Sequence, residues 1–235
     1  MIKARTRTGT IGRARTGTIG RARTGTIGRA RTGTIANIRD YTGQVVLVTG
    51  AGRGAGRLLA EAFAARGALV AANDISPVNV EMVVAGITTT GGRARAYIHD
   101  IAKKVDVQAM VNNIMDDYGR IDILINSANV LLPTSLLDID EWDLHRVFEV
   151  NAIGTFLMMQ SVGRVMRTQA GGIIVNIVKI PANAPASFIA SRAGLAAMTA
   201  RIQEELSQSN IRVFSYTGKN PIEEVLASCQ PAVLV

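Results

Sequence analysis

The stretch V-V-L-V-T-G-A-G-R-G-A-G, residues 45–56, decides the fold. Apolar and β-branched residues run directly into a turn with glycine at every second position, and an alanine-rich segment of helical character follows over 57–66. Such a turn needs glycine because its backbone adopts positive φ angles and lets a diphosphate approach closely. The helix behind it directs free N–H groups and its positive dipole end at that diphosphate. The pattern predicts strand, turn and helix.

An acidic residue at the expected distance favours dinucleotide binding over a purely structural turn. Asp74 ends a second apolar run, 68–73, at the place roughly 20 residues beyond the turn where a carboxylate would meet the adenosine ribose. That carboxylate accepts hydrogen bonds from the ribose hydroxyls and repels a 2′-phosphate. The spacing therefore predicts NAD as the cofactor.

Charge is distributed unevenly along the 235 residues, whose net charge is +8. Residues 1–40 hold ten Lys/Arg and one acid, so 41–235, with 16 basic and 17 acidic residues, is near neutral and has no basic bias toward nucleic acid. Cys229 is the single cysteine, which excludes a disulfide framework and a cysteine metal cluster. No apolar run reaches the length of a membrane span, and no secretory h-region is present. We expect a cytoplasmic protein without a metal site or membrane association.

The segment 5–36 is a tandem repeat with a period of eight residues, R-A-R-T-G-T-I-G in its commonest form. One Ile per repeat is too little apolar surface for a solenoid. An arginine-rich arm could bind nucleic acid or an anionic membrane, and its acid-poor composition also resembles a mitochondrial transit peptide. Because the repeat cannot offset its ordering entropy, we expect 1–40 to be a disordered low-complexity arm, with any nucleic-acid contact confined to it.

The remainder, 41–235, alternates apolar strands with helices. Strands are predicted at 44–49, 68–74, 95–99, 121–126, 172–178 and 211–216, with a further short one at 232–235; helices are predicted at 54–66, 78–90, 103–118, 140–169, 188–207 and 221–228. Alternation of this kind is typical of a parallel sheet covered on both faces. The prediction is a single α/β domain with a doubly wound parallel sheet, a three-layer α/β/α Rossmann fold.

Several ordered motifs give 41–216 a resemblance to a known family. T-G-A-G-R-G-A-G at 49–56 is similar to T-G-x-x-x-G-x-G, N-S-A-N at 126–129 to N-N-A-G, and F-I-A-S-R-A-G-L at 188–195 to Y-x-A-S-K-A-G-L. With these motifs the chain resembles the short-chain dehydrogenase/reductase family. The resemblance implies an NAD(P)(H)-binding oxidoreductase that transfers hydride between the cofactor and a carbonyl or alcohol. The implied cofactor contacts are Gly50, Gly52, Arg53, Gly54, Ala55, Gly56, Asp74, Ile75, Asp100, Ile101, Asn126 and Ala128.

The catalytic positions depart from the family pattern. The family uses a Tyr to exchange the proton, a Lys to lower the Tyr pKa and hold the ribose, a Ser to bind the carbonyl oxygen, and an Asn to support a water chain. Asn151 matches, whereas Phe188 stands at the Tyr position, Arg192 at the Lys position, and Lys179 or Val178 at the Ser position. We therefore expect impaired catalysis, unless an Arg192-depressed pKa lets Lys179 serve as acid and oxyanion partner.

Three functions remain open: an NAD(H)-dependent oxidoreductase with altered acid–base residues, a catalytically silent dinucleotide-binding or oligomer-forming relative, and an interaction protein that uses its basic arm. NADP is the less favoured cofactor, although Arg53 resembles the basic turn residue of NADP-using relatives. Helices 140–169 and 188–207 carry more apolar and small residues than one sheet face needs, and the family pairs them across a two-fold axis. We expect a homodimer or homotetramer, with a shortened C-terminal substrate region.

Overall fold

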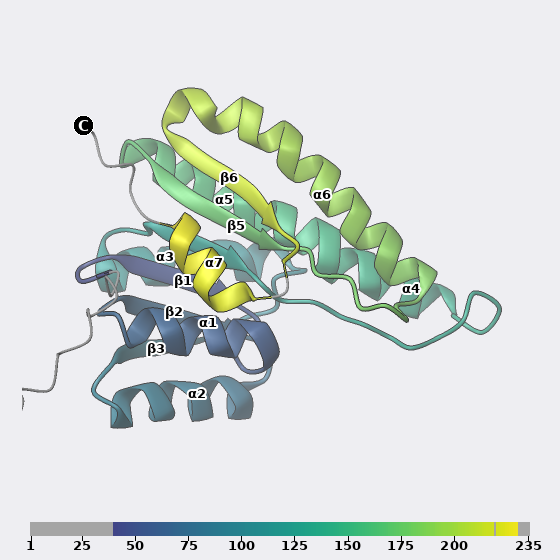
Figure 1. Ribbon diagram of the computed structural model, residues 1–235, viewed down its shortest axis with the longest axis horizontal. Helices are drawn as coiled ribbons and strands as arrows, with labels where there is room; N and C mark the ends of the chain where they lie inside the picture. The colour runs from purple at the N-terminus through teal and green to yellow at the C-terminus, as the bar shows by residue number, and fades with distance from the viewer. Residues whose placement is uncertain (1–39, 219, 230–235) are drawn as a thin grey trace, which may run out of the picture. The chain divides into compact units, whose positions relative to one another are not determined.

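The computed structural model describes residues 40–218 and 220–229. The predicted arm, apart from Asp40, and the predicted short strand 232–235 lie outside these described residues. Within them the chain forms one six-stranded sheet in which every neighbouring pair is parallel (Figure 1). The predicted fold class, a single α/β domain of the Rossmann type, is confirmed.

The strands take the spatial order β3-β2-β1-β4-β5-β6. Their bounds are β1 Val45–Thr49, β2 Leu69–Asp74, β3 Arg93–Ile98, β4 Ile123–Asn126, β5 Gly172–Ile177 and β6 Ile211–Tyr216. The order reverses direction at β1, which pairs with β2 on one side and β4 on the other. Such a switch point opens a crevice beyond the carboxyl ends of the strands, where ligands bind in doubly wound sheets.

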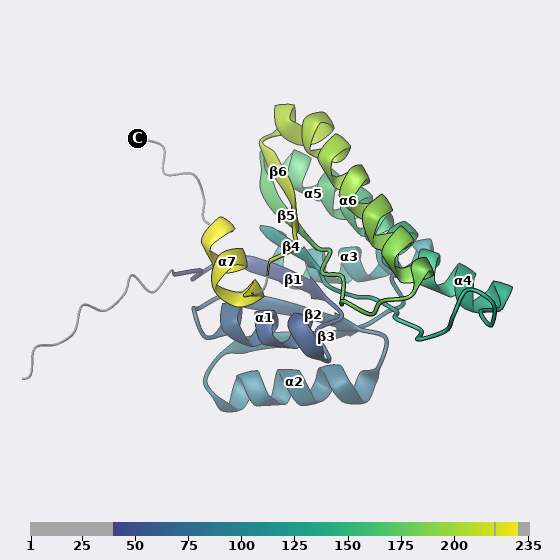
Figure 2. The same cartoon turned by 45° about the vertical axis from the view of Figure 1, so that its right-hand side comes forward.

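Helices cover both faces of the sheet and produce three layers (Figures 1 and 2). One core packs α1 (Gly54–Ala64), α2 (Pro77–Thr89) and α7 (Pro221–Ser228) against one face of the strands. The other core packs α3 (Lys104–Tyr118), α5 (Thr155–Thr168) and α6 (Ala186–Leu206) against the opposite face. The central strand β1 is buried along its whole length, which explains its unbroken apolar sequence.

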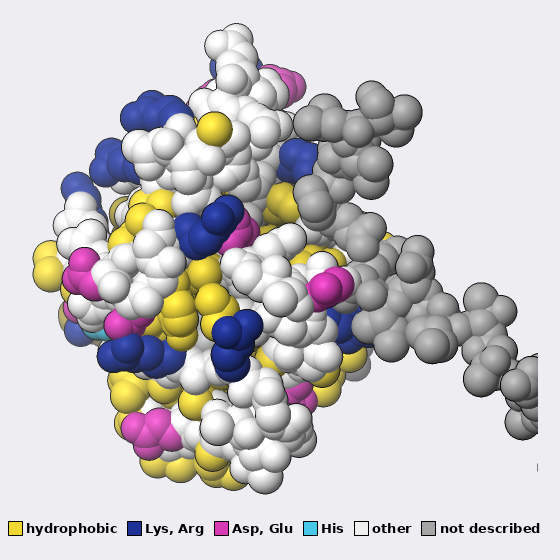
Figure 3. Space-filling view, turned by 90° about the vertical axis from the view of Figure 1, so that its left-hand side faces the viewer, with side chains coloured by type: hydrophobic (Ala, Val, Ile, Leu, Met, Phe, Trp, Pro, Cys, Tyr) yellow, Lys and Arg dark blue, Asp and Glu magenta, His cyan; other side chains and the backbone are white. Residues whose placement is uncertain are grey.

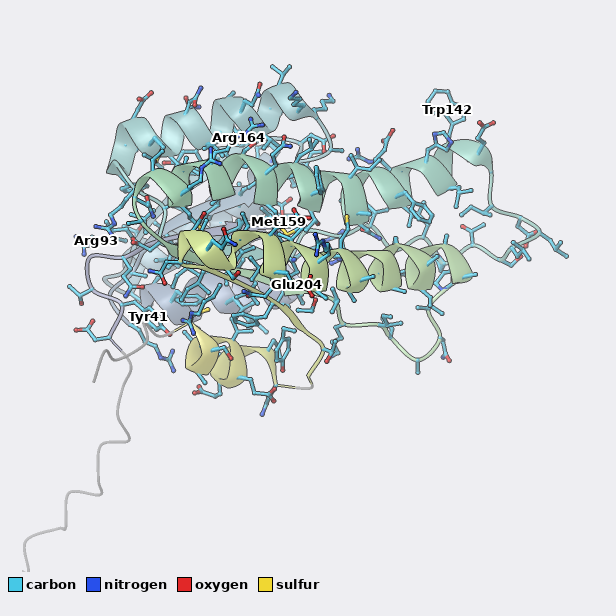
Figure 4. All side chains as sticks on the ribbon, turned by 90° about the horizontal axis from the view of Figure 1, so that it is seen from above. Tyr41, Arg93, Trp142, Met159, Arg164 and Glu204 are labelled. Atoms are coloured by element: carbon cyan, nitrogen blue, oxygen red, sulfur yellow. The ribbon has the colours of Figure 1, made fainter. Side chains whose placement is uncertain are left out.

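The predicted helix 140–169 is a continuous helical column built in three parts. Asp140 caps its start by accepting a hydrogen bond from the backbone N–H of Asp143, and α4 (Glu141–Phe148) follows. A π-helical turn, η1 (Glu149–Gly154), then leads into α5. Figure 4 shows this column, with Trp142 at its projecting end and Met159 and Arg164 farther along it. π-Helical turns occur often at functional sites, and this one carries Asn151.

Most element ends agree with the sequence within one or two residues, because local signals fix them. Ser76 caps α2 through its side chain and Pro77 is its first residue, while Gly119 ends α3 with a φ of 73°. The short 3-10 turn η2 (Ser207–Ser209) extends the end of α6. Figure 3 views the face where the strands begin, on which basic and acidic side chains are interspersed.

Candidate functional site

A cleft of about 560 Å³ lies at the carboxyl ends of the strands, where the topology predicts a ligand. It brings together twelve of the residues singled out in the sequence: Gly50, Arg53, Gly54, Ala55, Asp74, Ile75, Asp100, Ile101, Ala128, Lys179, Phe188 and Arg192. Gly52, Gly56, Asn126 and Asn151 are not among its lining residues. Gly56, Asn126 and Asn151 are buried, and Gly52 is half-buried.

The glycine turn allows three backbone segments to meet without side chains between them. Gly50 has a φ of +64°, and a Cβ there would lie 2.6 Å from Cα of Ala128. A Cβ on Gly56 would collide with the carbonyl oxygen of Gly50. Gly54 has a φ of +58°. The turn therefore needs glycine at Gly50 and Gly54 for backbone conformation, and at Gly50 and Gly56 for close approach.

Helix α1 begins at the cleft with its first amides uncapped by a side chain. Arg53 is the N-cap residue, and its side chain makes no capping hydrogen bond. Gly54 and Ala55, in the first turn, line the cleft. The first N–H groups of a helix have no partner within the helix and form a ready-made phosphate site. The cradle thus fits the diphosphate of a dinucleotide.

The carboxylate of Asp74 is held in place at the end of β2. Its Oδ2 accepts a hydrogen bond from the Gly52 backbone N–H at 2.9 Å, and its Oδ1 accepts one from the Ser76 N–H at 3.0 Å. A Cβ on Gly52 would lie 2.8 Å from Asp74 Oδ2, so this contact also requires glycine. Each carboxylate oxygen keeps a free lone pair, which suits it to accept from ribose hydroxyls.

Asp100 forms an ion pair that the sequence did not predict. Arg146 Nη1 on α4 lies 3.1 Å from Asp100 Oδ2, and Asp100 Oδ1 accepts a hydrogen bond from the Ala102 N–H. Arg146 and His99 also line the cleft. The ion pair joins residues 46 positions apart, and no local pattern in the sequence predicts it.

Asn126 faces the interior between β4 and β5. Its Nδ2 donates to Asn176 Oδ1 at 2.8 Å, and Asn176 Nδ2 donates to Thr199 Oγ1 at 2.8 Å. The Thr199 hydroxyl in turn donates to the Leu195 carbonyl. This buried chain ties two central strands to α6, and it leaves the neighbouring Ser127 and Ala128 to line the cleft.

Asn151 on the π-helical turn clamps the segment that follows β4. Its Oδ1 accepts from the Val130 N–H at 2.8 Å, and its Nδ2 donates to the Val130 carbonyl at 2.9 Å. The same Nδ2 donates to Ser191 Oγ at 3.1 Å, and the Ser191 hydroxyl donates to the Phe188 carbonyl. Asn151 therefore positions α6, which carries Phe188 and Arg192, against the cleft wall.

Phe188 and Arg192 lie one helical turn apart on α6 and contact each other. The guanidinium carbon of Arg192 is 5.3 Å from the centroid of the Phe188 ring, a cation–π arrangement. Arg192 is only 2% exposed, and its Nε and Nη1 meet no acceptor among the described residues. Burial lowers the pKa of Arg192 to about 10, so the side chain stays charged at neutral pH.

Two further polar side chains line the cleft. Lys179 is exposed on the segment that follows β5. Tyr216, at the end of β6, was not singled out in the sequence. Burial, followed by the negative charge of Glu224, raises the pKa of the Tyr216 phenol, which makes it a weaker acid than free tyrosine.

Known proteins share this fold and this sequence pattern. The sequence model of the family described as "short chain dehydrogenase" matches residues 44–218. The chain is 36% identical over 177 residues to D-threitol dehydrogenase of Mycolicibacterium smegmatis, an alignment that covers 73% of this chain and 67% of that protein. It is 38% identical over 178 residues to the NAD-dependent glycerol dehydrogenase of Listeria innocua, covering 73% and 68% of the two chains.

Solved structures give the same result. A metagenomic short-chain oxidoreductase in complex with NADP superposes with a TM-score of 0.75 at 26% identity, covering 81% of this chain and 92% of that one. NAD+-bound xylitol dehydrogenase superposes with a TM-score of 0.72 at 31% identity, covering 82% and 77%. The chain belongs to the short-chain dehydrogenase family of NAD(P)-dependent oxidoreductases.

Metal and membrane features can be stated for the described residues alone. In 40–218 and 220–229, no group of three or more His, Cys, Asp or Glu side chains is arranged to hold a metal ion. In the same ranges, no helix combines the length and the apolar character that crossing a bilayer requires.

The buried charge of Arg192 generates a stability prediction. An uncompensated buried cation lowers stability, and an apolar side chain of similar length removes that cost. We expect Arg192→Met to raise the free energy of unfolding by about 1 kcal/mol in chemical denaturation of the ligand-free protein. Arg201→Met, at an exposed position of the same helix, is the control and should change stability by less than about 0.5 kcal/mol. Destabilisation by Arg192→Met would show that the contacts of the guanidinium, the Phe188 ring among them, outweigh the cost of burying its charge.

Proposed function

We propose that this chain binds a nicotinamide dinucleotide in the cleft and that its own hydride-transfer chemistry with a small carbonyl or alcohol is impaired. The observation that carries the proposal is the pair Phe188 and Arg192. Both line the cleft, and the sequence resemblance aligns them with the Tyr and Lys of the family. The glycine cradle, the uncapped start of α1 and the fixed Asp74 carboxylate support binding of the cofactor.

The expected impairment follows from the lack of a proton donor at the reacting oxygen. When bound, the dinucleotide supplies or accepts the hydride. Reduction of a carbonyl then leaves an alkoxide, which needs a proton and an oxyanion partner. Phe188 has no exchangeable proton, and the buried guanidinium of Arg192 holds its own proton at neutral pH. Lys179 remains the candidate acid, because it lines the cleft and its side chain ends in an amine, which donates hydrogen bonds and accepts none when charged.

Restoring the family side chains tests this proposal. We expect the triple variant Phe188→Tyr, Arg192→Lys, Lys179→Ser to gain NADH-dependent carbonyl reduction, measured by NADH absorbance over a substrate panel. A positioned acid contributes about 10²- to 10⁴-fold, so a gain within that range is expected. The double variant Arg192→Lys, Lys179→Ser lacks the phenol and should show no gain.

Two outcomes separate the rival functions. A native protein that is already fast, and that loses its activity in Lys179→Ala, would make Lys179 the working acid and contradict the impaired site. A triple variant that binds NADH but gains no activity would favour a dinucleotide-binding protein without catalysis.

Cofactor preference gives a second test. We propose NAD over NADP, because the Asp74 carboxylate would lie beside the 2′-phosphate of NADP and repel it. That repulsion is larger than the attraction between the phosphate and one exposed side chain, Arg53. Calorimetry should show tighter binding of NADH than of NADPH, and Asp74→Ser should reduce the difference. Arg53→Ala should enlarge it. Equal or tighter binding of NADPH by the native chain would overturn this preference.

Assembly gives a third test. We propose a homodimer or homotetramer through η1, α5 and α6, since Ile153 and Phe156 are exposed large apolar side chains on that surface. Such side chains on a helical face favour burial against a second copy. Light scattering of the native protein should give at least twice the mass of one chain. A monomer at micromolar concentration would reject the proposal.

A further inference from the structure

We propose that the part of the cleft lined by Arg192 and Lys179 is a carboxylate-binding site in which Arg192 is the principal ligand and Lys179 the second cation. The occupant would be a small hydroxy acid or oxo acid. The inference deepens the proposed function and rests on it, because it names the substrate class that would lie beside the cofactor. It assigns Arg192 a role in binding the substrate.

The first argument is the unsatisfied state of a buried charge. Arg192 is 2% exposed, and neither Nε nor Nη1 has an acceptor among the described residues. Those two atoms carry three of the five guanidinium N–H donors. A buried charge is costly unless it is paired with an opposite charge, so an anion that reaches the guanidinium would complete the site. Because Nε and Nη1 are closed to solvent, its entry requires a local shift of the side chains around them. A neutral ribose hydroxyl could accept one hydrogen bond but would leave the charge uncompensated.

The second argument is that the acidic residues lining the cleft interact with other partners. Among the described residues, Asp74 and Asp100 are the acids that line it. Asp74 accepts from two backbone N–H groups of the glycine turn and of the segment before α2. Asp100 is paired with Arg146. Neither compensates Arg192, and Lys179 adds a second positive charge at the end of β5.

The third argument is the shape of the site. The Phe188 ring lies 5.3 Å from the guanidinium carbon, and stacking of this kind holds the guanidinium plane in one orientation. A fixed planar fork matches the two oxygens of a carboxylate better than it matches a single hydroxyl. Burial lowers the pKa of Arg192 to about 10. That pKa still lies above neutral pH, so Arg192 stays protonated, as the site requires.

Calorimetry with a charged probe and its neutral counterpart tests the site. The full-length protein, with and without saturating NADH, is titrated with oxamate and with the neutral ester methyl oxamate. We expect oxamate to bind at least tenfold more tightly. Arg192→Gln should erase that preference, Arg192→Lys should retain part of it, and Lys179→Gln should weaken oxamate binding several-fold. Arg201→Gln, at an exposed arginine of the same helix, should leave oxamate binding unchanged.

Several results would overturn the assignment. They are equal binding of oxamate and its ester by the native chain, an undiminished preference in Arg192→Gln, and binding of inorganic phosphate as tight as that of oxamate. A loss of NADH affinity in Arg192→Gln with oxamate selectivity unchanged would place the guanidinium on the cofactor instead. Failure of the native chain to bind NADH would contradict the proposed function but not the carboxylate site. The titration with oxamate in the absence of NADH tests the carboxylate site separately.

Discussion

The structure depends on one close contact, the approach of α1 to the turn that precedes it. Gly56 packs against the carbonyl of Gly50, and Gly50 packs against the backbone of Ala128, with no side chain at either position. These contacts place the start of α1, the end of β1 and the segment after β4 at the same point. The cleft exists because three backbones meet there, and any Cβ would drive them apart.

Buried polar side chains hold the same strand ends from the interior. Thr49 Oγ1 accepts hydrogen bonds from the N–H groups of Ser127 and Ala128, and Asn73 Nδ2 donates to the carbonyls of Tyr97 and His99. Each of these bonds satisfies backbone groups just where a strand stops and its ladder ends. The cleft wall is therefore fixed before any ligand arrives, which reduces the ordering cost of binding.

The sequence predicts the fold well because its signals are local. Apolar runs, the glycine turn and the spacing to Asp74 each lie within one β-α-β unit, and the structure brings them together at the cleft. Contacts between distant segments could not be predicted. The pairing of Arg146 with Asp100 and the interior orientation of Asn126 depend on helix placement and strand register, which emerge only once the sheet is assembled.

Phe188 and Arg192 show how fold and chemistry can separate in one helical turn. An aromatic ring and a long cation keep the packing that α6 needs, and Ser191 still bridges Phe188 to Asn151. On the proposed correspondence with the family's Tyr and Lys, the hydrogen-bonding chemistry differs. Phe188 has no phenol proton, and in place of a point-like ammonium Arg192 presents a broad fork whose Nε and Nη1 have no acceptor among the described residues. On our proposals, the scaffold stays intact while the cleft lacks a group that gives up a proton and holds one that requires an anion.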